Sequence, residues 1–309
     1  MARFLLLFVD GVGLAPPGDD NPLATVPMPA LTAALGGLLT SERLGARDGV
    51  VVAALDATLG VAGLPQSATG QTALFTGENA PAILGRHVPA LPGPRLGALL
   101  AERSVLKLAG EAGRAATFAN PFSPRYFAEV AARRRKHSAT TRAALAAPAP
   151  LRTLDDLARG EACTWDVTRE RFRDWEPGVA PIAAEEAGRQ LAALAAGHDL
   201  TLWETFMTDL AGHHRFGWTA AAALGRLDGL LAGLLPARAA DLTILLVSDH
   251  GNLEEAGHRR HTRNPVPLVA LGPEAVRFAD LDRIDRLAPR LLALMGVGEA
   301  SFQPRTSHF

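Results

Sequence analysis

The sequence predicts an α/β protein with a doubly wound, mostly parallel sheet and a small inserted cap. Short apolar runs that end at a polar residue or glycine are typical of strands buried on both faces of a parallel sheet. Between them lie longer stretches with apolar residues three and four positions apart, as in helices that pack on a sheet. The alternation of the two patterns along the chain is typical of a doubly wound fold.

The first predicted strand is the apolar run Phe4–Val9, which ends at Asp10 and Gly11. Later runs of similar length and composition predict the other strands of the same sheet. These runs are Val50–Leu55, Ala115–Ala119, His198–Phe206, Leu242–Ser248 and Pro267–Leu271.

Helices are predicted in the stretches between the strands, where apolar residues recur at helical spacing. In the last stretch, leucines spaced three and four apart make a single apolar stripe that can pack on the sheet. The predicted helices are Ala30–Leu39, Ala68–Thr76, Leu96–Gly113, Ile182–Ala196 and Thr219–Leu235.

The segment from about Asn120 to Pro181 interrupts this alternation. It contains the proline-rich run APAP at 147–150, the basic run Arg133–Lys136 and two separated tryptophans. We therefore expect residues 121–181 to form an inserted cap on a catalytic core built from residues 1–120 and 182–309. The basic run is most simply a solvated helix face, although one of its bases, or Arg125 nearby, could grip a substrate phosphate.

Composition and charge exclude several classes of protein. Apolar residues make up 48% of the 309 residues and charged residues 20%, which excludes a wholly disordered chain. The 31 basic and 32 acidic residues give a net charge of -1, so no overall field favours nucleic acid or an anionic membrane. The run Phe4–Val9 is shorter than a signal-peptide core, and no uncharged run approaches the ~18–20 residues of a membrane span. The one cysteine, Cys163, fits a small core residue in a reducing cytoplasm.

Acidic residues and histidines stand where the predicted strands end or begin. Asp10 follows the first strand, Asp209 follows the fourth, the pair Asp249–His250 follows the fifth, and His261 precedes the last. A single aspartate there is usually a turn former. Three aspartates that converge on one crevice would repel each other unless cations neutralised them. Carboxylates mixed with imidazoles suit zinc, manganese or iron better than magnesium or calcium.

His213 is the natural partner of Asp209, because a spacing of four residues puts both on one face of a helical turn. Two further histidines, His214 and His258, are possible substitutes for their neighbours.

The stretch GLPQSATGQTALFTG at 63–77 contains a candidate nucleophile, Ser67, just before a predicted helix. Its simplest role is to cap that helix. The same position could present an anion to free backbone N–H groups, and a serine hydroxyl bound to a metal there becomes a nucleophile at neutral pH. Thr69 is the alternative nucleophile.

Five motifs occur in the same order as in the metal-binding core of the alkaline phosphatase superfamily, and the chain resembles cofactor-independent phosphoglycerate mutases and phosphopentomutases most closely. The likeness covers residues 1–85 and 198–272 and does not extend to the cap. The motifs are VDGVG, QSATG, DLAGH, SDHGN and HTRNPVP.

This resemblance implies two divalent metal ions, Mn²⁺ or Zn²⁺, and a phosphoenzyme formed on Ser67. It places Asp10, Ser67, Asp249 and His250 around one ion and Asp209, His213 and His261 around the other. Further contacts to a small phosphorylated substrate are expected from Thr69, Gln71, Arg125 and Asn252.

The chain also departs from the mutase pattern. These mutases usually have a histidine directly after the glycine of the nucleophile motif, where this chain has Gln71. The cap is short and lacks a recognisable arginine-rich substrate motif. We therefore expect a metal-dependent phosphohydrolase or phosphotransferase, with a phosphoglycerate- or phosphosugar-type mutase as the alternative.

Other classes fit less well. The Gly11-x-Gly13 pair suggests a dinucleotide site, but the third glycine of that fingerprint would fall on Pro16. Neither the G-x-S-x-G elbow of serine hydrolases nor a sulfatase motif surrounds Ser67. A non-catalytic, metal-stabilised binding protein remains an alternative, and a closed coordination shell would distinguish it.

Overall fold

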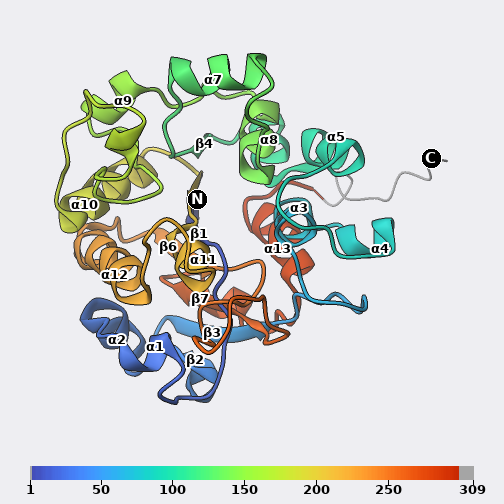
Figure 1. Cartoon of the computed structure of the whole chain (residues 1–309), viewed down its shortest axis with the longest axis vertical. Helices are drawn as coiled ribbons and strands as arrows, with labels where there is room; N and C mark the ends of the chain where they lie inside the picture. The colour runs from blue at the N-terminus through green and yellow to red at the C-terminus, as the bar shows by residue number, and fades with distance from the viewer. Residues whose placement is uncertain (1, 299–309) are drawn as a thin grey trace.

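The computed structural model describes residues 2–298 and confirms an α/β fold with helices on both faces of one sheet (Figure 1). The sheet has seven strands in the order β2-β3-β7-β6-β1-β5-β4. The strands are β1 (Arg3–Val9), β2 (Gly45–Arg47), β3 (Val50–Leu55), β4 (Ala116–Phe118), β5 (Leu200–Thr205), β6 (Leu242–Val247) and β7 (Val266–Leu271).

Strand direction decides which loops meet. β1 pairs in parallel with β5 and β6, and β4 pairs in parallel with β5. β7 runs antiparallel to both β6 and β3, and β2 runs antiparallel to β3. The carboxyl ends of β1, β3, β5 and β6 therefore share one edge with the amino end of β7, so the residues just before β7 reach the same place.

All six predicted strands are present, with ends that differ by at most two residues. The seventh, β2, was not predicted because it has only three residues, all exposed at the sheet edge, and no apolar pattern.

Alternation along β1 separates two cores. Phe4, Leu6 and Phe8 point to one face, where α3, α5, α6, α8 and α13 pack, and Leu5 and Leu7 point to the other, where α2, α10 and α12 pack. Figure 1 shows these two groups of helices on opposite sides of the strands. The helices are α1 (Pro22–Thr25), α2 (Pro29–Leu35), α3 (Ser67–Thr76), α4 (Ala80–Leu84), α5 (Pro94–Arg103), α6 (Val105–Glu111), α7 (Pro124–Ala131), α8 (Ala139–Ala146), α9 (Leu154–Ala158), α10 (Ala184–Ala196), α11 (Met207–Gly212), α12 (Ala220–Ala237) and α13 (Leu287–Leu294).

The prediction of one helix over Leu96–Gly113 was wrong, because the chain forms two helices, α5 and α6, separated at Ser104. This residue is extended, with ψ 144°, and fully buried, and its hydroxyl donates to the carbonyl of Ala143 in α8 at 3.5 Å. The break turns the chain so that both helices pack against α8.

Helix α12 is long and apolar enough to cross a membrane by length and composition alone. In the fold it packs against α10 and α2, and its leucine stripe is buried in the core. The buried carboxylate of Asp228 accepts hydrogen bonds from the backbone N–H groups of Ala30 and Leu31, at 3.2 and 2.8 Å, at the start of α2. A carboxylate at the start of a helix stabilises its free N–H groups and the positive end of its dipole. This bond and the buried leucines together give α12 the contacts of a core helix.

Parts of the segment 121–181 pack into the α/β core, so the segment is not a separate cap over it. Its helix α8 packs in the core with α3, α5 and α6, and Cys163 and Val167 are buried in the opposite core. Burial raises the pKa of the Cys163 thiol to about 12, in keeping with an inert core residue. The basic run Arg133–Lys136 forms a turn after α7 rather than a helix face, and Arg134 makes a bidentate pair with Glu129 at 2.8 Å.

Candidate metal centre

The edge where the parallel strands end gathers the acidic residues and histidines predicted as ligands. Asp10 follows β1 directly, Asp249 and His250 follow β6, and Asp209 lies in α11 after β5. His261 reaches the same edge because it precedes the antiparallel strand β7.

One group of side chains surrounds His250. Its Nε2 lies 3.3 Å from Oδ1 of Asp10, 3.6 Å from Oδ2 of Asp249 and 3.0 Å from Oγ of Ser67. These are the four residues that the resemblance assigns to one ion.

The second group joins Asp209, His213 and His261. Oδ1 of Asp209 lies 3.3 Å from Nε2 of His213 and 3.8 Å from Nε2 of His261, and the two Nε2 atoms are 3.1 Å apart. Oxygen and nitrogen ligands bound at about 2.0–2.2 Å to one tetrahedral ion lie roughly 3.2–3.6 Å from each other. The spacing of this group is therefore close to that of a ligand set.

The two histidines of the second group face each other through their Nε2 atoms, and in neutral rings neither of these atoms carries a proton to donate. Nδ1 of His213 bonds to the carbonyl of Arg259 at 2.8 Å, and Nδ1 of His261 bonds to the carbonyl of Pro65 at 2.9 Å. A carbonyl only accepts, so each Nδ1 carries the proton and a neutral ring leaves a bare lone pair on Nε2. Burial, followed by the charge of His250, lowers the pKa of His261 to about 4, which keeps that ring neutral. Two lone pairs 3.1 Å apart repel unless a cation lies between them.

The carboxylates of Asp10 and Asp249 would also be stabilised by a bound cation. Both carboxylate oxygens of Asp249 and Oδ1 of Asp10 are buried without a hydrogen-bond partner among the described residues. Burial raises the pKa of Asp10 well above its usual range, and the charges of Asp249 and Asp209 raise it further. Burial likewise raises the pKa of Asp249. Unpaired buried carboxylates are costly, and a divalent cation compensates them.

His250 connects the two groups. Its ring stacks on that of His261 at 3.7 Å between centroids, and it lies within ligand range of Asp10 and Asp249 on one side and Asp209 and His261 on the other. The residues present therefore fit divalent cations.

Ser67 is the first residue of α3, and the residue at the cap position is Gln66. The interpretation of Ser67 as the helix cap is therefore wrong by one position, and its hydroxyl instead meets His250. The close approach depends on Gly70, because a Cβ there would lie 2.8 Å from the carbonyl oxygen of Asp249.

Two predicted substrate contacts touch the ligand groups directly. Nε2 of Gln71 donates to Oδ2 of Asp10 at 3.3 Å, and Nδ2 of Asn252 donates to Oδ1 of Asp209 at 2.9 Å. Both amides hold a carboxylate in place.

The remaining predicted residues are engaged elsewhere. The Thr69 hydroxyl donates to the carbonyl of Gln66 and accepts from the N–H of Val88. Arg125 donates to the carbonyl of Trp175 at 2.7 Å. His214 accepts from Arg259, and His258 bonds to Glu255, so neither substitutes for its neighbour in the cluster.

Sequence reasoning missed Glu254, which ties the ligand-bearing loops together. Its buried carboxylate accepts from the backbone N–H groups of Gly13 (2.9 Å) and Asn252 (2.8 Å), from the Thr262 hydroxyl and from Nδ2 of Asn264 (3.0 Å). These partners follow β1, follow β6 and precede β7. No local pattern marks a residue whose partners come from three distant loops.

We expect Glu254→Gln to weaken metal binding by about 10–100-fold, because an amide cannot accept from all four donors and the loops then lose their alignment. Calorimetric titration of metal into the stripped protein measures this. The neighbouring Glu255→Gln, at the rim of the same loop, is the matched control and should bind metal as the wild type does. Equal affinity of Glu254→Gln and the wild type would contradict the role of Glu254.

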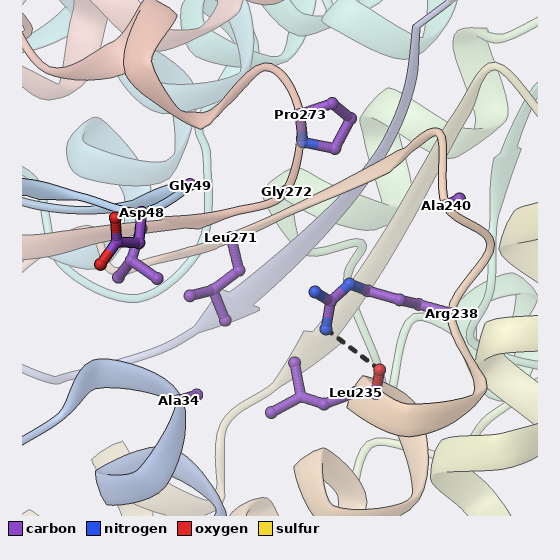
Figure 2. Close-up of a pocket in the computed structure, with 10 residues that line it drawn as sticks. Ala34, Asp48, Gly49, Leu235, Arg238, Ala240, Leu271, Gly272 and Pro273 are labelled. Atoms are coloured by element: carbon purple, nitrogen blue, oxygen red, sulfur yellow. Dashed lines mark hydrogen bonds between the residues drawn. The ribbon is translucent and has the colours of Figure 1, made fainter.

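The hollow drawn in Figure 2, of about 660 Å³, lies at the opposite edge of the sheet. It is lined where β3 begins, where the antiparallel β7 ends and just before β6, at Val50, Leu271 and Ala240. Beside it, Arg238 donates to the carbonyl of Leu235, three residues earlier at the end of α12, at 3.0 Å. It contains none of the predicted site residues.

A carboxylate and imidazole cluster at the carboxyl edge of a doubly wound sheet fits a divalent metal centre. Residues 181–299 match the family model of the Metalloenzyme superfamily, a segment that carries Asp209, His213, Asp249, His250 and His261. The fold is similar to that of a solved protein from Pyrococcus horikoshii, with TM-score 0.58, 15% identity and coverage of 96% of this chain and 98% of that one. It is also similar to alkaline phosphatase from the Antarctic bacterium TAB5, with TM-score 0.53, 12% identity and the same coverages.

The C-terminal segment 181–299 is therefore similar to the Metalloenzyme superfamily, and the candidate ligand groups support the use of divalent metal. Over 124 residues the chain is 33% identical to the 2,3-bisphosphoglycerate-independent phosphoglycerate mutase of Cronobacter sakazakii. Over the same length it is 34% identical to the mutase of that name from Serratia proteamaculans. Each alignment covers 37% of this chain and only 24% of the relative, so the likeness is confined to part of each protein.

Proposed function

We propose that the protein transfers the phosphoryl group of a small phosphorylated metabolite through a phosphoserine on Ser67, with two divalent cations. The observation that carries the proposal is the position of Ser67 at the first turn of α3, with its Oγ 3.0 Å from His250 and beside buried carboxylate oxygens that lack hydrogen-bond donors. Free N–H groups at a helix start favour a phosphoryl group, and the cluster beside them favours cations.

In this proposal Asp10, Ser67, Asp249 and His250 hold one cation, and Asp209, His213 and His261 hold the second. The bound cations supply positive charge that lowers the pKa of the serine hydroxyl and neutralises charge on the transferring oxygens. Ser67 Oγ attacks phosphorus, and the first N–H groups of α3 orient the phosphoryl oxygens. Gln71 and Asn252 keep Asp10 and Asp209 aligned.

Hydrolysis or transfer to a second molecule is the activity we favour. Gln71 bonds to Asp10 where mutases usually carry a histidine, and Arg125 is engaged with Trp175. A mutase must enclose its dephosphorylated intermediate under a cap. Part of the segment 121–181 belongs to the core, so few of its residues are left to form such a cap. The activity named for the two relatives makes a phosphoglycerate-type mutase the second candidate.

A screen of phosphorylated metabolites that measures both free phosphate and isomerised product separates the two. Phosphate release without isomerisation supports our proposal. Interconversion of 3- and 2-phosphoglycerate without phosphate release would establish the mutase instead.

Removal of metal tests the cations. We expect protein purified without chelator to contain about two divalent ions per chain and to lose its activity when stripped. Readdition of Mn²⁺ or Zn²⁺ should restore activity and raise the unfolding temperature, because the ions bind only the folded state. Elemental analysis and thermal melts measure both effects. Full activity in the stripped sample would disprove the proposal.

A further inference from the structure

Four exposed arginines lie beside the histidines of the second ligand group, and we call them the arginine rim. Residues 213–217 and 257–263, twelve in all, contain these four arginines and no acidic residue, in a chain whose 31 basic and 32 acidic residues nearly balance. Each of the four is one or two positions from His213 or His261 in the sequence. The rim consists of Arg215, Arg259, Arg260 and Arg263.

The arginine rim has no acidic partner among residues 2–298. No ion pair joins any of its four side chains to an aspartate or glutamate. On the same loop, the Glu254 carboxylate holds the ligand-bearing loops together, and Glu255 accepts from Nδ2 of Asn264 at 2.8 Å and bonds to His258 at 2.9 Å. Positive charge that no nearby acid neutralises attracts anions to this part of the surface.

Arg263 leaves the chain on the same side as the ligand His261. Thr262 forms a β-bridge with Gly251, so the chain is extended there, and successive side chains point to opposite sides. The hydroxyl of Thr262 donates to the buried Glu254, so His261 and Arg263 both point away from Glu254. Two residues of extended chain span at most ~7 Å, so the Cα atoms of His261 and Arg263 lie within that distance.

The charge of Arg263 also reaches His87, in the loop that contacts the start of α3. Burial lowers the pKa of His87, and the positive charge of Arg263 adds to this effect. The neighbouring N–H of Val88 donates to the hydroxyl of Thr69 at 3.2 Å, two residues after Ser67. Arg263 therefore lies between the segment that carries His261 and the loop that contacts the first turn of α3.

The guanidinium of Arg263 is available to a ligand. Its side chain is exposed, and it makes no hydrogen bond or ion pair among residues 2–298. Arg259, by contrast, donates from Nε to Nδ1 of His214 at 3.2 Å. A guanidinium presents paired N–H donors whose spacing matches the two oxygens of a carboxylate or phosphate.

We propose that Arg263 binds a second anionic group of the substrate, a carboxylate or phosphate on the alcohol from which the phosphoryl group is transferred. This inference rests on the function proposed above. The substrate class is then a phosphate monoester with two anionic ends, one at Ser67 and the cations and the other at Arg263. The rest of the arginine rim adds positive potential that favours the same substrates.

Binding of unreactive phosphonates to the metal-loaded protein tests this contact without catalysis. The two probes are 3-phosphonopropionate and propylphosphonate, which differ only in that a carboxylate replaces a methyl group. We expect the wild type to bind the carboxylate compound about tenfold more tightly, as for a charge-assisted bidentate pair, and Arg263→Gln to bind both about equally. Calorimetric titration measures the affinities, and the preference should shrink as KCl is added, because salt screens exposed charges.

Kinetics on phosphoglycolate and ethyl phosphate, which differ in the same way, give a second readout. Arg263→Gln should raise KM for phosphoglycolate about tenfold at nearly unchanged kcat, and should leave both constants for ethyl phosphate within about twofold. Arg263→Lys should keep part of the preference, because it keeps the charge but not the paired donors. Arg47→Gln, exposed in β2 at the edge of the sheet, is the matched control and should behave as the wild type does.

The outcomes separate this inference from the function on which it rests. The same preference in the wild type and in Arg263→Gln, or none in the wild type, would overturn the role of Arg263. Equally weakened binding of both phosphonates in Arg263→Gln would also overturn it, since that result indicates damage to the metal centre. A wild type that binds neither phosphonate would defeat the proposed phosphoryl site, and this inference with it.

Discussion

Ser67→Ala should lower turnover by several orders of magnitude, about 10³-fold or more, as expected when a covalent nucleophile is removed. The physical reason is that, among the described residues, no other hydroxyl is hydrogen-bonded to the ring of His250. The fold should survive, because the change deletes a small group at the first position of a helix. Steady-state kinetics and thermal melts measure the two effects.

The covalent intermediate gives an independent check on Ser67. Mass spectrometry of acid-quenched wild type should find a phosphorylated peptide that contains Ser67, and Ser67→Ala should lack it. Thr69→Ala is the matched comparison, since the Thr69 hydroxyl already bonds to Gln66 and Val88. An active Ser67→Ala beside an inactive Thr69→Ala would mean that the nucleophile was assigned to the wrong residue.

Asp249→Asn should have opposite effects on metal binding and on the stability of the stripped protein. Loss of a buried ligand should weaken metal binding by more than the 10–100-fold typical of residues outside the ligand set, and activity should fall with it. Without metal, however, Asp249 is a buried carboxylate beside Asp10, so its neutral amide should stabilise the stripped fold. Each kcal/mol gained should raise the unfolding temperature by about 2–4 °C.

The sign of the pH dependence follows from the same burial. The pKa values of Asp10 and Asp249 are raised in the folded state, so the native protein binds more protons than the unfolded chain, and these groups cost stability as pH rises above their unfolded values near 3.8. Stripped Asp249→Asn should therefore lose less stability than stripped wild type between acid and neutral pH. Exposed Asp241→Asn, a partner of Arg3, is the control. A lower unfolding temperature for stripped Asp249→Asn would contradict this account.

The strands could be predicted because each is an apolar run with a sharp polar end, and that pattern depends on neighbours in sequence alone. Helix ends were harder. The break at Ser104 depends on a contact with Ala143 in another helix, and β2 has no burial to create a pattern. The segment 121–181 was expected to be a cap because it interrupts the alternation of strand and helix patterns. Its alanine-rich helix α8 nevertheless packs against other helices of the core.

The sequence alone determined the α/β class and the chemistry of the strand ends, because residue type and order record which side chains follow each strand. Only the tertiary structure decided which of them meet. The antiparallel course of β7 brings His261 to the edge shared with Asp10, and Gly70 lets α3 approach Asp249 so that Ser67 meets His250. The buried partners of Glu254 come from loops far apart in the chain, so no local pattern could reveal them. Burial in the folded chain, rather than composition, raises the pKa values of Asp10 and Asp249.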